Sequence, residues 1–320
     1  MNGSITDVPG IEVGHAQDLE AGKGCTVVLF RKGAVPGVDS RGGAPATRET
    51  DCLRPENFLP AMHAVFLTGG SAYGLDCAGG IMRCLEQQGV GFDIGVALVP
   101  IVAGAALNDL AFGDPKRRPD AAMGYEACRN ASAAESRQGN IGAGIGACIG
   151  RLAGNARGSM KGGLGTASLR VGELVVGAIV AVNCNGDVLD AETGQLLAGT
   201  LRPGRMKIAG ARTLLTAAGG SFKEGFPTNT TIGVIGTNAA LTKGAATRIA
   251  MNAQDGYAMT IQPVHTMGDG DVIFCMGTGS VQADLTRLGA LAAWVMAGAV
   301  TNAIRAADGL LGVPCMKELA

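Results

Sequence analysis

The alternation of apolar runs and glycine-rich breaks along the chain predicts a mixed α/β fold. Apolar runs of strand length lie at residues 25–30, 63–68, 96–102, 174–182, 230–236 and 272–276. Longer stretches have apolar residues near helical spacing and predict helices, since one face of a helix repeats every three to four residues. These stretches are residues 75–88, 121–134, 242–257 and 283–307.

The order of these elements favours two sheets covered by helices over one parallel sheet, because few strands alternate with helices in strict βαβ order. Asn185-Gly186 lies between two apolar runs and predicts a two-residue hairpin turn. Residues 37–43 predict a polar, glycine-rich loop, and residues 205–228 an irregular, exposed connection of the kind that tolerates a chain break. Without a repeat or a low-complexity linker, residues 1–320 are expected to form a single catalytic domain.

Composition adds that the layers of this fold must approach closely. The chain has 52 glycines and only 4% aromatic residues, so its core is expected to consist of small aliphatic side chains. The net charge is −1 with scattered basic residues, which argues against a nucleic-acid or membrane-surface partner. The start of the chain lacks the pattern of a signal peptide. The apolar run 289–300 is too short to span a bilayer and predicts a buried helix.

Cysteine and histidine usage argues against disulfides and metal sites. The nine cysteines are odd in number, widely spread and without a C-x-x-C pair. They are typical of small buried side chains in a reducing compartment, so we expect a cytoplasmic protein. Three histidines are too few to favour a histidine-based metal site.

Four features are candidates for chemistry, each with a plainer alternative. Asp269-Gly270-Asp271 precedes a strand, and residues i and i+2 of an extended chain face the same side. Such a pair can bind a cation, share a proton, or hold an amine and a hydroxyl, although a solvated turn is the commoner role. Asn183 ends a strand and is either an oxyanion donor or a turn residue. His265 has the chemistry of a base, but the sequence supplies no partner for it, so a structural role is the plainer alternative. The glycine-rich segment 142–147 matches a dinucleotide fingerprint but follows polar residues instead of a strand.

Read together, these features resemble one family. The matching motifs lie in order along nearly the whole chain, at residues 5–15, 38–43, 67–75, 161–168, 229–232, 262–266 and 269–271. They resemble the self-cleaving aminopeptidases and amidases of the L-aminopeptidase/D-esterase (DmpA) type. That family includes β-peptidyl aminopeptidases and the 6-aminohexanoate-oligomer endohydrolase, or nylon hydrolase, whose Asn-Thr cleavage site and paired Asp this chain shares.

The resemblance implies a four-layer αββα sandwich and a mechanism based on an N-terminal nucleophile. Self-cleavage is expected between Asn229 and Thr230, giving an α chain of residues 1–229 and a β chain of residues 230–320. Thr230 is then the nucleophile, Asp269 and Asp271 lie beside it, and Asn183 is the oxyanion donor. A small peptide, amino-acid amide or oligoamide is the expected substrate. No metal or organic cofactor is required, and a homo-oligomer, a tetramer of αβ units, is expected.

The chain also departs from nylon hydrolase in the substrate pocket. Asn108 and Arg151 occupy the positions of a functional Tyr and Lys, and the motif that contains Tyr73 adds a third pocket candidate. Arg keeps the charge of Lys but not its compact geometry. Two alternatives remain open: a self-cleaving acyltransferase of the ornithine acetyltransferase type, which uses an amine acceptor instead of water, and a non-catalytic homologue that binds a small molecule.

Overall fold

The computed structural model describes residues 1–320 except 153–157, 203, 205, 218–228 and 320. Within this described part, nine strands form one hydrogen-bonded array. In spatial order the array runs through β10 (Gly163–Val171), β11 (Leu174–Asn183), β14 (Thr230–Ala239), β16 (Val272–Val281), β2 (Lys23–Ser40), β4 (Met62–Thr68), β7 (Val102–Ala106) and β3 (Thr47–Arg48), with β1 (Glu12–Asp18) also paired to β2.

The long strand β2 joins the two sheets of a sandwich. Its first part pairs with β4, from Cys25 to Leu29, and its last part pairs with β16, from Val35 to Ser40. The register of the β2–β4 pairing shifts between Leu29 and Ala34, where the strand passes from one sheet to the other. The sequence predicted only the apolar first part of β2 as a strand. Residues 37–40, predicted as a loop, are strand residues because they continue into the second sheet.

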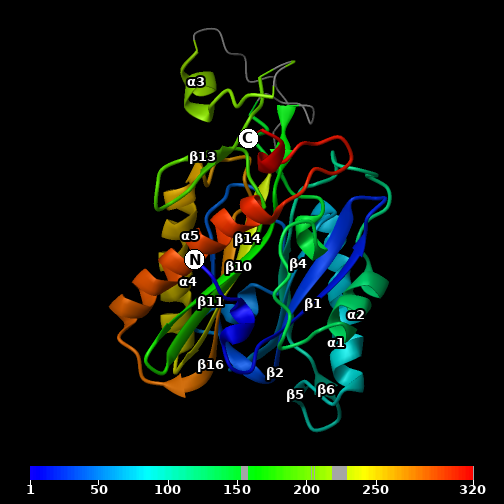
Figure 1. The fold of residues 1–320 in the computed structure, drawn as a ribbon. Coiled ribbons are helices and arrows are strands. Elements are labelled where there is room, and N and C mark those ends of the chain that lie inside the picture. Colours follow the sequence, from blue (N-terminus) through cyan, green and yellow to red (C-terminus); the bar gives the residue numbers. More distant parts are fainter. Residues whose placement is uncertain (153–157, 203, 205, 218–228, 320) are drawn as a thin grey trace.

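Three buried clusters correspond to the three interfaces between four layers (Figure 1). The helices α4 (Lys243–Thr260) and α5 (Leu285–Ala306) pack on the sheet of β10, β11, β14 and β16. The helices α1 (Cys77–Gln87) and α2 (Ala121–Arg129) pack on the sheet of β1, β2 and β4. Between the sheets lie side chains such as Val28, Val65, Val234 and Phe274. The predicted αββα sandwich is confirmed.

Glycines allow the close approach of helices that the composition implied. A Cβ atom on Gly165 of β10 would lie 2.0 Å from the carbonyl oxygen of Ala299 in α5. One on Gly80 of α1 would lie 1.7 Å from the carbonyl oxygen of Ala121 in α2. Real Cβ atoms do not approach oxygen so closely, so any larger residue would push these layers apart.

Side-chain caps fix the starts of the main helices. Thr242 accepts the N–H of Ala245 at the start of α4, and Asp284 accepts the N–H of Arg287 at the start of α5. Helix α5 has 22 residues, more than its apolar run suggested, and is long and apolar enough to cross a membrane by length and composition. The fold buries 72% of its most apolar window, as in the core helix of a soluble protein.

The hairpin predicted at Asn185-Gly186 is wrong. Strand β12 (Asp187–Leu189) does not fold back on β11 but pairs with β13 (Leu196–Ala198) and β15 (Ile261–Gln262). The reason is a tertiary contact: a Cβ on Gly186 would lie 2.3 Å from the carbonyl oxygen of Pro263, so this glycine serves close packing.

The remaining described elements are short. They are the strands β5 (Phe92–Asp93), β6 (Leu98–Val99), β8 (Cys148–Ile149) and β9 (Met160–Lys161), the helix α3 (Ala211–Thr216), and the 3₁₀ turns η1 (Ile5–Asp7), η2 (Asp51–Leu53), η3 (Ser71–Asp76), η4 (Gly142–Gly144) and η6 (Met316–Glu318). Helix α3 lies in the predicted irregular connection, half of which falls outside the described residues. The nine cysteines are free and all but Cys52 are buried, as predicted.

Candidate active site

Thr230 is the first residue of β14 and is only 3% exposed. Its register partner in the antiparallel ladder is Asn183, the last residue of β11. Residues directly opposite in such a ladder project from the same face with Cβ atoms about 5 Å apart. Two predicted site residues that are far apart in the sequence therefore meet at one sheet end.

The peptide bond before Thr230 is held at its carbonyl oxygen by two donors. The Thr230 hydroxyl donates to the carbonyl oxygen of Asn229 at 2.5 Å, and the backbone N–H of Gly270 donates to the same oxygen at 2.9 Å. A Cβ atom on Gly270 would lie 2.9 Å from Thr230 Oγ1, so glycine is needed between the two aspartates. The hydroxyl thus lies against the carbonyl that self-cleavage would attack.

Asp271 ties the start of β14 to His265. One carboxylate oxygen accepts the backbone N–H of Thr231 at 2.8 Å. The other accepts the backbone N–H of His265 at 3.0 Å and lies 2.9 Å from its Nδ1. His265 has a left-handed backbone conformation, φ 57°, which is costly for a residue with a side chain. The structure therefore supplies the partner that the sequence could not assign to this histidine.

Asp269 is held by side chains on both carboxylate oxygens. Asn185 Nδ2 donates to one oxygen at 3.0 Å, and the hydroxyl and N–H of Thr266 donate to the other. Burial, and after it the charge of Asp271, raise the pKa of Asp269 to about 6, although the hydrogen bonds from Thr266 oppose the rise. This carboxyl group therefore changes its protonation near neutral pH.

Asn183 is oriented by two backbone groups. Its Oδ1 accepts the N–H of Cys148 at 2.9 Å, and its Nδ2 donates to the carbonyl oxygen of Asn108 at 3.2 Å. The amide nitrogen carries a second hydrogen, which this arrangement leaves for another acceptor. The geometry fits the predicted oxyanion donor.

The predicted pocket residues divide into two groups. Two of them contact the Thr230 cluster, by which we mean Asn183, Asn185, Asn229, Thr230, His265, Thr266, Asp269 and Asp271. Arg151 is buried, and its Nη1 donates to Asn229 Oδ1 at 3.5 Å. Asn108 accepts a hydrogen bond from Asn183 through its backbone carbonyl. Among the described residues, Tyr73 makes no hydrogen bond with the other site residues. It is 61% exposed, and the Arg118 guanidinium lies over its ring, 3.8 Å from the centroid.

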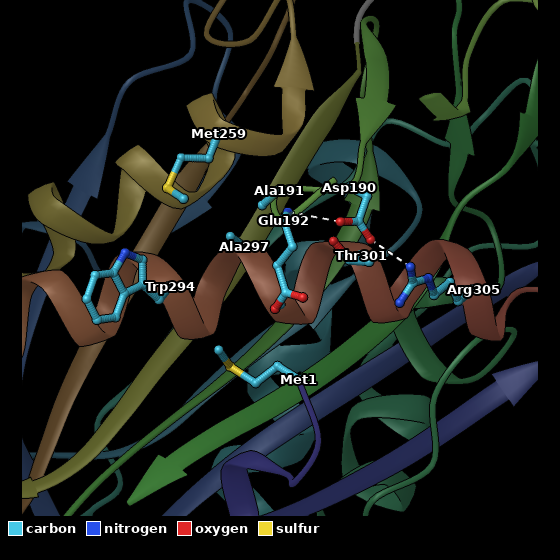
Figure 2. A pocket seen from close by; sticks show the side chains of 10 residues that line it. Met1, Asp190, Ala191, Glu192, Met259, Trp294, Ala297, Thr301 and Arg305 are labelled. Atoms are coloured by element: carbon cyan, nitrogen blue, oxygen red, sulfur yellow. Dashed lines mark hydrogen bonds and ion pairs between the residues drawn. The ribbon is translucent and has the colours of Figure 1, made fainter. Parts of the chain in front are cut away.

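Two cavities differ in their relation to this cluster. The first, of about 360 Å³, lies on the outer face of α5 beside Trp294 and the Asp190–Arg305 ion pair (Figure 2). None of its lining residues belongs to the Thr230 cluster. The second, of about 480 Å³, is bordered by Asp187 and Pro263. In the sequence, these lie two residues from Asn185 and His265 of the cluster. Among the residues that the structure describes, no group of His, Cys, Asp and Glu could hold a metal ion.

Sequence reasoning missed several residues that shape the site. Asn185 was assigned to a hairpin turn, and Thr266 was noted only within a motif. Lys161 appeared only as part of a glycine-rich motif, yet its side chain is fully buried. Burial of a lysine leaves no periodic pattern in the sequence. A lone lysine inside an apolar, glycine-rich stretch is nevertheless a signal from which its burial could have been predicted.

Comparison with known proteins shows the family of the chain. Residues 3–315 match the sequence model of peptidase family S58. The chain is 42% identical to an uncharacterized aminopeptidase of Mycobacterium leprae (strain TN), over 97% of this chain and 92% of the relative. It is 29% identical to a 6-aminohexanoate-oligomer endohydrolase of Kocuria sp. (strain KY2), over 93% of this chain and 85% of the relative.

Solved structures share the fold. An L-aminopeptidase D-Ala-esterase/amidase from Ochrobactrum anthropi, described as a variant of the Ntn hydrolase fold, superposes with a TM-score of 0.71 at 20% identity, covering 97% of this chain and 88% of that one. A Burkholderia sp. β-aminopeptidase has a TM-score of 0.69 at 20% identity and covers 99% and 92%. The family model and the named relatives identify a hydrolase that acts on peptide or amide bonds. The chain belongs to peptidase family S58.

Proposed function

We propose that the protein is a self-processing amide hydrolase whose nucleophile is the hydroxyl of Thr230, freed as an N-terminal residue by cleavage after Asn229. The observation that carries this proposal is the contact of that hydroxyl with the Asn229 carbonyl oxygen at 2.5 Å, beside two buried carboxylates. A threonine hydroxyl is a weak nucleophile unless a base is near it, and this cluster supplies candidates for that base.

In the self-cleavage step, Thr230 Oγ1 attacks the carbonyl carbon of Asn229. The C–N bond to the Thr230 nitrogen breaks, and the hydroxyl proton ends on that nitrogen. The product is an ester, which water hydrolyses to leave an Asn229 carboxylate and a free Thr230 amine. The Gly270 N–H, already 2.9 Å from the carbonyl oxygen, stabilises the charge that develops there.

In the mature enzyme the new amine is the base for its own hydroxyl. An α-amine has a pKa of roughly 8, so part of it is neutral at pH 7. It takes the hydroxyl proton as Thr230 attacks a substrate amide, and the acyl-enzyme is then hydrolysed. Asn183 Nδ2 donates to the oxyanion of the substrate, while Asp269 and Asp271 hold the hydroxyl and the ammonium.

The proposed substrates are small peptides, amino-acid amides or oligoamides. This range is supported by the names of the relatives, an aminopeptidase and an oligomer endohydrolase. Arg151, buried beside Asn229, is the cation of the proposed pocket. By family resemblance we also propose a homo-oligomer, and the cysteine usage supports a cytoplasmic location.

The test combines processing and turnover. Purified wild type and Thr230→Ala are incubated at neutral pH, weighed by mass spectrometry, and assayed with p-nitroanilides of L-Ala, D-Ala and β-Ala. Wild type should separate into residues 1–229 and 230–320 and release p-nitroaniline from at least one substrate. An uncut, inactive wild type would overturn the proposal. Addition of amino-acid acceptors separates hydrolysis from acyl transfer.

A further inference from the structure

The peptide group between Ala147 and Cys148 connects the proposed oxyanion donor to a buried cation. Its N–H donates to Asn183 Oδ1 at 2.9 Å. Its carbonyl oxygen accepts from the Lys161 ammonium at 2.6 Å and from the Gly162 N–H at 3.0 Å. One rigid peptide plane therefore has a lysine on one side and the Asn183 amide on the other.

Within the described residues, the Lys161 ammonium donates all its hydrogen bonds to backbone carbonyls of one turn, residues 144–147. Besides the Ala147 carbonyl, its ammonium donates to the carbonyl oxygens of Ile145 at 2.8 Å and Gly144 at 3.4 Å. The side chain is 0% exposed, and residue 161 pairs with Cys148 in the β8–β9 ladder. The glycine-rich segment that matched a dinucleotide fingerprint thus wraps a lysine. Burying an ammonium is costly, so its complete use on one turn requires an explanation.

We propose that Lys161 is a positioning residue for Asn183, which it orients and polarises through the Ala147–Cys148 peptide. The inference rests on the proposed function, because it concerns the oxyanion donor of the mature enzyme. The dipoles run head to tail from the ammonium through the peptide and the Asn183 amide to the free Nδ2–H. Hydrogen bonds in such a chain strengthen one another, so the last N–H becomes a better donor.

The same chain fixes which way the Asn183 amide points. A flipped amide would place its NH₂ group against the N–H of Cys148, donor against donor. Lys161 holds that peptide in place, and the Asn108 carbonyl accepts from the Nδ2 side. The second Nδ2 hydrogen is thereby directed without a contribution from the substrate.

Lys161 lies among other titratable groups, which set its charge. Cys148 and Asp109 face it and raise its pKa, while Lys23 lowers it. Burial is the largest influence and brings the pKa of Lys161 down to about 8. Its ammonium nitrogen also lies over the Phe112 ring, 4.8 Å from the ring centroid. A loss of charge at Lys161 is therefore expected within an accessible pH range.

The experiment uses Lys161→Met, which removes charge and donors, and Lys161→Gln, which keeps a neutral donor. Lys243→Met is the matched control, because that ammonium also donates to two backbone carbonyls, of Cys52 and Asn57, away from the site. For each protein we measure the rate of self-cleavage, kcat and KM with the best anilide, and the pH profile of kcat.

Self-cleavage uses the Gly270 N–H, so it should run within about threefold of wild type and shows that each variant is folded. The kcat of both Lys161 variants should fall roughly 10- to 100-fold, the usual effect of removing a group that orients a functional side chain, with KM within about twofold. The fall in wild-type kcat above pH about 8 should be absent from Lys161→Gln. Lys243→Met should match wild type.

Three outcomes would overturn the inference. One is a self-cleaving Lys161 variant with wild-type kcat. Another is an equal fall in self-cleavage and kcat, which assigns Lys161 to folding. The third is an alkaline limb that persists in Lys161→Gln. Failure of the proposed function is recognised separately, because wild type itself then stays uncut.

Discussion

The two sides of Thr230 carry opposite chemistry. On the side of β16 lie Asp269 and Asp271, both 1% exposed and each accepting hydrogen bonds on both carboxylate oxygens. On the side of β8 and β9 lie an amide, Asn183, and a buried cation, Lys161, whose donors are used on backbone carbonyls. The hydroxyl sits between an acidic region and a cationic one.

We infer from this difference that the two regions stabilise different groups during the reaction. The acidic region suits a proton, a hydroxyl or the new ammonium, which all carry positive charge or donate hydrogen bonds. The cationic region suits an oxyanion, which accepts them. Both regions are fixed before any substrate is present, so neither has to reorganise during the reaction. The predictions below break one region at a time.

The largest effect is expected from Thr230→Ala, which removes the group that both regions serve. Self-cleavage should be abolished and amide hydrolysis reduced by roughly 10⁵-fold or more, as for loss of other catalytic nucleophiles. Mass spectrometry and anilide hydrolysis measure the two effects. If this variant still splits after Asn229, a contaminating protease cuts the chain.

Breaking the cationic side at Asn183→Ala should lower kcat by roughly 10²- to 10³-fold, the cost of losing one oxyanion donor. Self-cleavage should continue, because the Asn229 carbonyl is held by Gly270 and not by Asn183. A time course of intact mass, followed by turnover of the cleaved protein, separates the two steps. Equal losses in both would show that the regions do not divide the steps.

Gly270 lies between the two aspartates and against the Thr230 hydroxyl. Gly270→Ala should slow self-cleavage by up to about 10²-fold, since a shift of about 1 Å at a reacting group has that effect. The added Cβ would lie 2.9 Å from Thr230 Oγ1 and 2.6 Å from the Ala44 carbonyl oxygen. Gly244→Ala, on the open N-terminal turn of α4, is the matched control, because its nearest atom would be 4.0 Å away. Wild-type processing by Gly270→Ala would contradict the tight fit.

The smallest effect concerns the pH dependence of stability on the acidic side. The pKa of Asp269 is raised from 3.8 to about 6 in the folded protein, so the folded state binds its proton more tightly than the unfolded chain. Its contribution to the free energy of unfolding therefore falls as pH rises from 3.8 to about 6. Asp269→Asn should show a less negative slope across that window in denaturant titrations. Identical slopes would contradict the assignment.

The sequence predicted the layers and the strand that begins at Thr230 well, because both depend on local apolar patterns. The apolar run after Thr230 begins a strand at that residue. The Asp-Gly-Asp segment lies beside the start of this strand, where Asp269 forms a backbone bridge with Asn229 and the Asp271 carboxylate accepts the N–H of Thr231. Apolar periodicity located the long helices α4 and α5 within a few residues.

What the sequence missed depends on contacts between distant segments. Asn185-Gly186 has the composition of a hairpin turn, but β12 pairs with β15, more than 70 residues away. His265 acquires its partner only when the segment before β16 curls back on Asp271. Lys161 acquires its role only when the turn 144–147 closes around it. These contacts join segments that are distant in the sequence, and the periodicity of apolar residues does not show which distant segments meet.

The most direct test of the central claim is the intact mass of freshly purified wild-type protein incubated at neutral pH, with the N-terminus of the smaller fragment sequenced. We predict two masses, for residues 1–229 and 230–320, and a new N-terminus that begins Thr230-Thr231-Ile232. A single unchanged mass after prolonged incubation, or a new N-terminus at any other residue, would contradict the account.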